Sequence, residues 1–177
     1  MRSEKLFSLL LPILFLISFR FNPVYADSSY VLPYPSTMPG NSIYKIHTLY
    51  ERLLRYWYFG DFGAFEYNIR ESDKYLVESK TLFEYKQYLL AYNSLQLSDQ
   101  YFLKIKPALL KAQKDGKNIS EKNTIMESEA QKHIEVLTDL EKIVPSTIIW
   151  SPENSTPSTL KSAEEINNSI KIRNKVL

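Results

Sequence analysis

The strongest structural signal in the chain lies in residues 53–67, Leu-Leu-Arg-Tyr-Trp-Tyr-Phe-Gly-Asp-Phe-Gly-Ala-Phe-Glu-Tyr. Seven aromatic residues surround Gly60 and Gly63, the only closely spaced pair of glycines in the chain. We interpret this stretch as the corner of a helical hairpin, in which Gly60 ends one helix and Asp61 caps the next. Because aromatic rings bury large areas, the pattern predicts that four of them belong to the core: Trp57, Phe59, Phe62 and Phe65. On this interpretation Trp57→Ala costs about 3–5 kcal/mol.

Outward from this corner, apolar residues recur every three or four positions, which is typical of helices with one buried face. A long helix is predicted from residue 61 to a break near 84–87, because an unbroken helix from 64 to 106 would exceed about 60 Å. Pro107 either kinks the next helix or opens a short new one. The predicted fold is all-α, an antiparallel bundle of four to five helices, since little strand-like alternation is present.

The first 26 residues have the pattern of a cleavable signal peptide. Basic residues precede an apolar run from Leu6 to Ile17, and Val24-Tyr25-Ala26 offers a cleavage site. The run is shorter than the roughly 20 residues of a bilayer span, so removal is favoured over retention as an anchor. We predict a signal peptide (1–26), an extended lead-in (27–41), a helical bundle (42–145), and a loop with a short C-terminal helix (146–177).

The amino-acid composition excludes several classes of function and of site. The leader holds three of the 22 basic and one of the 20 acidic residues. The rest of the chain therefore has equal numbers of basic and acidic residues, so its net charge gives no argument for nucleic-acid binding. The chain has no cysteine, so disulfides, thiolate metal sites and cysteine nucleophiles are excluded. No further apolar run follows the leader, so no membrane span is expected after cleavage.

Part of the chain resembles a known family. Residues 31–46, Val-Leu-Pro-Tyr-Pro-Ser-Thr-Met-Pro-Gly-Asn-Ser-Ile-Tyr-Lys-Ile, and then 56–60 and 71–78, resemble family 5667 of the domains of unknown function. Ile46-His47 departs from the Leu-Lys that members of this family often have. The resemblance covers about residues 31–103, and residues 104–173 look like a C-terminal extension. It implies an exported bacterial helical domain with no established activity and no catalytic residues to transfer.

Two His/Glu pairs are candidate metal ligands. His47 and Glu51, and likewise Glu129 and His133, are four residues apart and therefore share a helix face. If their helices are neighbours, the pairs could converge on one ion. The Glu-x-x-His motif of dicarboxylate helical metal sites is absent, and His–Glu pairs at this spacing are common on surfaces.

Tyrosines are the unusual feature of the composition. Many of the 13 lie between residues 44 and 101, and Tyr56, Tyr58 and Tyr67 are the candidates for an exposed surface that binds a peptide or glycan. The alternative is that their rings pack between helices with the hydroxyls at the solvent edge. The motifs of serine hydrolases, zinc proteases and phosphate-binding loops are all absent, so no enzyme and no cofactor are predicted.

The sequence therefore predicts a secreted or extracytoplasmic protein at the cell surface or in the periplasm. Its predicted role is a non-enzymatic binding or scaffold module of the bacterial cell envelope, with an envelope protein, peptide or glycan as partner. The alternative is a helical metal-binding or metal-sensing protein that uses His47, Glu51, Glu129 and His133.

Overall fold

The computed structural model describes residues 29–35, 37–151 and 156–177, and the predicted signal peptide lies outside them. The prediction of an all-α bundle is confirmed. In chain order the elements are α2 (Tyr44–Leu54), the 3-10 helix η1 (Arg55–Trp57), α3 (Gly60–Glu84), α4 (Tyr88–Phe102), α5 (Ile105–Lys114), α6 (Ser120–Ile143), β1 (Ile148–Trp150), β2 (Ser158–Leu160) and α7 (Ser162–Asn174).

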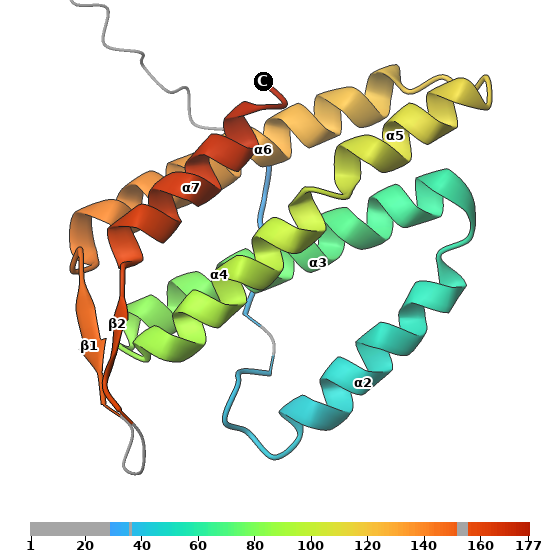
Figure 1. Ribbon diagram of the computed structural model, residues 1–177. Helices are drawn as coiled ribbons and strands as arrows, with labels where there is room; N and C mark the ends of the chain where they lie inside the picture. The colour runs from blue at the N-terminus through green and yellow to red at the C-terminus, as the bar shows by residue number, and fades with distance from the viewer. Residues whose placement is uncertain (1–28, 36, 152–155) are drawn as a thin grey trace, which may run out of the picture.

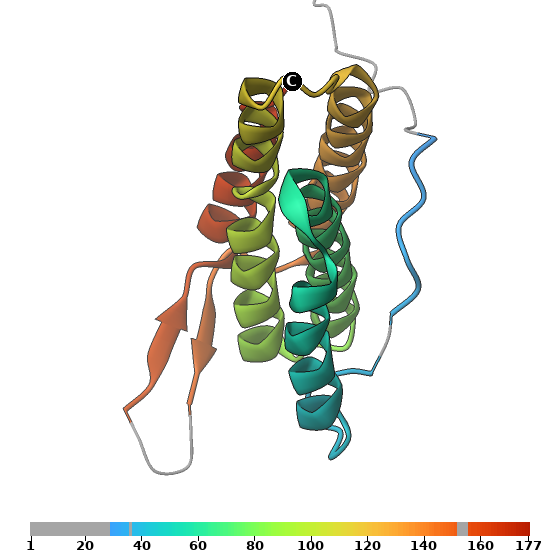
Figure 2. The same ribbon diagram turned by 90° about the vertical axis from the view of Figure 1, so that its right-hand side faces the viewer.

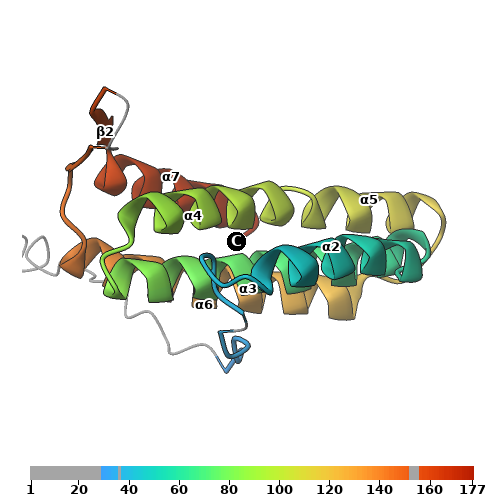
Figure 3. The same ribbon diagram turned by 90° about the horizontal axis from the view of Figure 1, so that it is seen from below.

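The long helices α3 and α6 form the framework of the bundle (Figure 1). α3 packs against α4, α5 and α6, and α7 packs against α6 and α4. Seen from below, α4 and α5 follow one another nearly in line (Figure 3). The view in Figure 2 shows that α2 lies on the outer side of α3. The turns between α3 and α4 and between α5 and α6 reverse the chain and make these helices antiparallel, whereas the two residues between α4 and α5 do not (Figure 1).

Local sequence explains where the helices end. The break predicted near residues 84–87 is present, because α3 ends at Glu84 and α4 begins at Tyr88. Lys86 turns the chain there with a φ of 60°. Pro107 occupies the third position of α5, in the first turn, where its missing N–H costs no helical hydrogen bond. It therefore opens a short helix and does not kink a longer one.

The core consists of two apolar clusters along the bundle. One joins α3, α4, α6 and α7 through residues that include Leu76, Leu95, Leu137 and Ile166. The other joins the start of α3 to α5 and α6 and includes Phe65. Several serines of α3 and α4 are also buried, and their small side chains let the helix backbones approach one another closely.

The corner at 53–67 differs from the prediction in its packing. Phe65 is 1% exposed and Phe62 is half-buried, but Trp57 is 76% and Phe59 81% exposed. The prediction that Trp57 and Phe59 belong to the core is therefore wrong. The physical reason is that the apolar stripe of α2 continues through η1 on the side facing away from α3.

Gly60 has the left-handed conformation predicted for it, but neither Gly60 nor Asp61 has its predicted place at a helix end. Gly60 has a φ of 69°, but it is the first residue of α3, and the preceding helical segment already ends at Trp57. A Cβ on Gly63 would lie 2.5 Å from the carbonyl carbon of Tyr58, so glycine lets the chain pass close to α3. Asp61 lies inside the first turn of α3 without capping it. Its carboxylate pairs with Lys111 and Lys117 at 2.9 and 3.0 Å, and hydrogen bonds from both lower its pKa to about 2.

The segment predicted as a loop after residue 145 contains a two-stranded antiparallel sheet. β1 pairs with β2, and Ile149 lies opposite Thr159. The described strands are three residues each, too short to show the alternation by which strands are recognised in a sequence. The hairpin leads into α7, which packs on the bundle as the short C-terminal helix predicted from the sequence.

Candidate functional site

An exposed apolar surface covers the outer side of α2 and η1. We call it the α2 outer face. It consists of large apolar side chains that are all more than half exposed: Ile43, Ile46, Leu49, Tyr50, Leu53, Tyr56, Trp57 and Phe59. Patches of this kind on a folded protein usually mark an interaction site.

The opposite side of α2 is polar and faces α3. Glu51 is buried and forms an ion pair with Lys74 of α3. The Tyr44 hydroxyl donates a hydrogen bond to the carboxylate of Glu78 at 3.0 Å. Burial raises the pKa of Glu78, although its hydrogen bonds oppose that shift. α2 is thus attached through polar contacts and presents its apolar stripe outward, the reverse of an ordinary amphipathic helix in a bundle.

The first predicted metal pair lies on this polar side. His47 Nδ1 is 3.2 Å from one carboxylate oxygen of Glu51, and the other oxygen of Glu51 pairs with Lys74. Among the described residues, the one group of three suited to a metal contains neither His47 nor Glu51. The two predicted pairs therefore do not share one ligand set.

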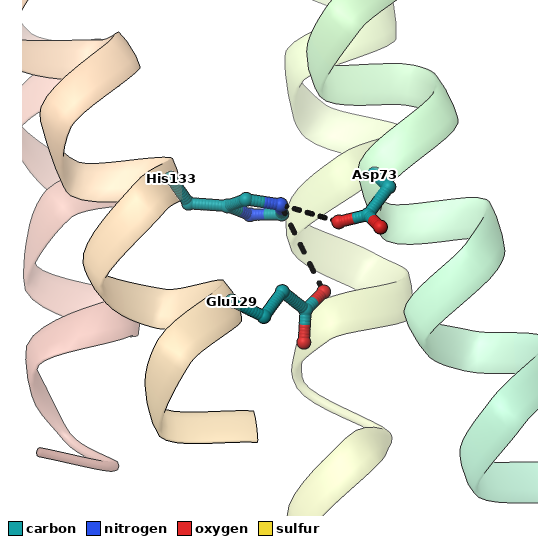
Figure 4. Close-up of side chains that lie close together, drawn as sticks. All are labelled: Asp73, Glu129 and His133. Carbon is teal, nitrogen blue, oxygen red and sulfur yellow. Dashed lines mark hydrogen bonds and ion pairs between the residues drawn. The ribbon is translucent and has the colours of Figure 1, made fainter. Parts of the chain in front are cut away.

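The second pair, Glu129 and His133 of α6, belongs to a buried polar centre that also contains Asp73 of α3 (Figure 4). His133 Nε2 lies 2.8 Å from Asp73 Oδ1 and 3.8 Å from Glu129 Oε1. One ligand atom from each of the three residues lies within 4.8 Å of the others. Tyr30 of the lead-in donates a hydrogen bond to Asp73 Oδ2 at 2.7 Å, so both oxygens of Asp73 have partners.

Arg173 of α7 determines the tautomer of His133. Its Nε donates a hydrogen bond to His133 Nδ1 at 3.1 Å. A guanidinium can only donate, so Nδ1 carries no proton and the proton of the neutral ring is on Nε2, facing Asp73. Burial lowers the pKa of His133, which keeps the ring neutral. Arg173 is itself fully buried and is paired with Asp99 of α4.

Glu129 is the member of this centre that lacks a hydrogen-bond partner among the described residues. It is fully buried, and neither carboxylate oxygen has a hydrogen-bond partner in the part of the chain that the structure describes. The pKa of Glu129 is raised well above its usual value of 4.5, mainly by burial and to a smaller extent by the negative charge of Asp73. Burial therefore favours the protonated form of Glu129, and a bound cation would have to displace that proton.

A pH dependence of stability follows from Glu129. Its proton stabilises the folded state fully below the usual pKa of 4.5, and this contribution is lost as the pH rises toward the raised folded-state pKa. As the pH rises above 4.5, the titration of Glu129 should cost the wild type up to about 1.4 kcal/mol of stability per pH unit. Urea denaturation across this pH range should show that Glu129→Gln weakens the decline, while Glu71 and Glu78, whose pKa values are also raised by burial, still contribute to it. The exposed Glu127→Gln is the control and should keep it.

The three tyrosines predicted for an exposed surface have different environments. Tyr56 is exposed, Tyr58 is half-buried and Tyr67 is only 5% exposed. The prediction is wrong for Tyr67, because its ring packs between Tyr58 and Tyr101, with ring centroids 5.7 and 5.9 Å away. Tyr58 and Tyr67 nevertheless line the same pocket, next to η1.

Sequence reasoning missed Asp73 and Arg173, the partners of His133. A signal was present in α7, where Arg173 follows Ile166 by seven residues and thus continues its apolar stripe. A charged residue at such a position indicates a buried partner. Asp73 lies three residues before the buried Leu76, again on the inner side of its helix.

No protein-family model, curated protein or solved structure matches the chain. The resemblance to family 5667 therefore stays a prediction. Within the described residues, no helix combines the length and the apolar character needed to cross a membrane.

Proposed function

We propose that the protein is an exported, non-enzymatic binding module of the bacterial cell envelope, and that it binds an envelope protein through the α2 outer face. The observation that carries the proposal is the orientation of α2, whose apolar stripe faces outward. Ile46, Tyr50, Leu53 and Trp57 recur at the spacing of a helix that inserts into the apolar groove of a partner. The buried polar centre has no exposed side chain, which argues against a catalytic role for it.

The charges of α2 favour a protein groove over a lipid surface. Helices that lie on membranes have a strongly charged, Lys/Arg-rich face opposite the apolar one. The corresponding face of α2 is directed toward α3 and carries the buried ion pair between Glu51 and Lys74. Lys45 and Arg52 are exposed on only one flank of the stripe.

The test is crosslinking capture from envelope extracts with wild-type protein and two matched double variants. Ile46→Ser/Leu53→Ser changes the α2 outer face, and Leu103→Ser/Ile143→Ser changes similarly exposed apolar residues elsewhere. We expect one envelope protein to be recovered with the wild type and the control but not with the α2 variant. That protein, once purified, should bind the wild type directly and with at least tenfold higher affinity than the α2 variant.

Three results would contradict this proposal. Capture that is equal for all three proteins would show that the α2 outer face is not used. Binding of the wild type, but not the α2 variant, to phosphatidylglycerol vesicles would assign the face to lipid. Concentration-dependent self-association that is lost in the α2 variant would assign it to a second copy of the chain.

A second candidate function is metal binding at Asp73, Glu129 and His133, favoured by the two unpartnered oxygens of Glu129. Carboxylate and imidazole ligands suit zinc and other divalent transition metals. The hydrogen bond from Arg173 opposes this function, because a metal on His133 Nε2 needs the proton to move to Nδ1. Coordination by His133 therefore requires Arg173 to turn away.

Thermal denaturation with saturating zinc or copper tests this second function. If the site binds, the melting temperature should rise for the wild type and for His47→Gln, but not for Glu129→Gln. The increase should grow with pH, because metal binding displaces protons from the ligands. An unchanged melting temperature for the wild type would exclude metal binding as a function. Loss of the increase in His47→Gln would assign the metal site to the first predicted pair, His47 and Glu51.

A further inference from the structure

A pocket of about 390 Å³ lies between the corner after η1, the first half of α3 and the joint between α4 and α5. This volume is within the range of small-ligand sites in proteins. Three tyrosine rings and two cations dominate its lining: Tyr58, Tyr67, Tyr101, Arg55 and Lys104. Ala64 and Ala108 also line it, and their small side chains leave space between the helices.

The tyrosine rings form one continuous wall. Tyr67 packs against Tyr58 on one side and edge-on against Tyr101 on the other. Tyr101 in turn stacks on Tyr75, with centroids 5.7 Å apart and ring planes 9° from parallel. This packing fixes the rings before any ligand arrives, and preorganised aromatic surfaces cost little conformational entropy on binding.

The two cations of the pocket have no acidic partner. Within residues 29–35, 37–151 and 156–177, neither Arg55 nor Lys104 forms an ion pair. Lys104 Nζ instead lies 4.9 Å from the centre of the Tyr101 ring. By comparison, Asp61 at the start of α3 pairs with two lysines. Neither cation of the pocket is therefore held by an acidic side chain, and both are available to an anionic group.

The Tyr58 hydroxyl is a further donor in the pocket, because of its hydrogen bond with Arg70. Arg70 Nη1 donates a hydrogen bond to the Tyr58 hydroxyl at 3.4 Å. Because arginine can only donate, the oxygen of Tyr58 is the acceptor and its own proton remains to be donated. The pocket thus combines two cations, a hydroxyl donor and flat apolar rings.

We infer that this pocket binds an anionic sugar residue. Arg55 and Lys104 supply the charge that a carboxylate or phosphate group requires, and charge-assisted hydrogen bonds are the stronger ones. Tyr58 and Tyr101, the two half-buried rings of the wall, supply the apolar surface on which the C–H face of a sugar ring packs. The inference is independent of the α2 outer face, because none of Arg55, Tyr67 and Lys104 belongs to it.

Glucuronic acid and glucose form a matched pair of probes, because they differ by the carboxylate. We expect glucuronic acid to give saturable shifts of the Tyr67 and Tyr101 ring resonances by NMR and glucose to give none. Arg55→Gln and Lys104→Gln should each raise the Kd about tenfold or more. Lys114→Gln, an exposed lysine on α5 outside the pocket, should leave the Kd unchanged. All the substituted residues are exposed, so the variants should fold.

A titration with inorganic phosphate completes the test. Phosphate should bind at least tenfold more weakly than glucuronic acid, because it has no face to pack on the rings. Equal affinity for phosphate would make the pocket a simple anion site and overturn the inference. Equal binding of glucose, or no binding of glucuronic acid, would also overturn it. Ile46→Ser/Leu53→Ser should bind glucuronic acid like the wild type, so failure here is separate from failure of the proposed function.

Discussion

Arg173→Met should lower the free energy of unfolding by about 3–5 kcal/mol, the usual cost of removing one partner from a buried ion pair. The guanidinium of Arg173 is fully buried and joins α7 to the rest of the bundle. It pairs with Asp99 of α4 and donates a hydrogen bond to the Ser98 hydroxyl at 2.8 Å and to His133 at 3.1 Å. Methionine fills similar space but leaves the charge of Asp99 without compensation.

Urea denaturation of Arg173→Met and three further variants, Asp99→Leu, the double variant and Lys171→Met, separates this effect from a general loss of packing. Lys171→Met, an exposed position two residues earlier on α7, is the matched control and should change stability by about 0.5 kcal/mol or less. Asp99→Leu combined with Arg173→Met removes both charges. We expect the double variant to be more stable than the sum of the two single effects predicts, by about 1–3 kcal/mol. Strict additivity would show that Arg173 and Asp99 do not stabilise each other.

The helical architecture could be predicted from the sequence because its signals are local. The break before Tyr88 follows from the change of apolar stripe, and the start of α5 follows from Pro107. Gly60 lies at the corner before α3 in a left-handed conformation that glycine adopts readily. Each of these features depends on neighbouring residues in the chain, so no knowledge of the tertiary structure was needed.

The orientation of α2 could not be predicted, because periodicity shows that a helix has an apolar stripe but not where that stripe faces. The direction depends on Glu51 and Tyr44, whose partners Lys74 and Glu78 lie on another helix. In most bundle helices the stripe faces the core, which explains the wrong prediction for Trp57 and Phe59.

The candidate site was predictable only in part, for the same reason. Glu129 and His133 were identified from their spacing of four residues on one helix. Asp73 is 60 residues from His133 and Arg173 is 40 residues from it. Contacts at these separations result from the packing of α3, α6 and α7, which the pattern of a single helix does not specify.

Phe65→Ala should cost about 3–5 kcal/mol, the range for removing a large buried aromatic side chain. Phe65 is 1% exposed and belongs to the cluster with Ile105, Leu109 and Met126, which joins α3 to α5 and α6. Alanine at this position would leave a cavity between three helices that are held by other contacts and cannot close around it. The measurement is urea denaturation at constant pH, with the slope compared to exclude a change in the unfolded state.

Trp57→Ala is the matched comparison, because it removes a still larger aromatic side chain from the same corner. With Trp57 76% exposed, stability should change by about 0.5 kcal/mol or less. The substitution should instead weaken binding of the envelope protein, since large aromatic residues contribute strongly to interfaces. A cost of several kcal/mol for Trp57→Ala would mean that its ring is buried and that α2 packs its apolar stripe against the bundle. That result would also contradict the proposed function, because the α2 outer face would then not be available to a partner.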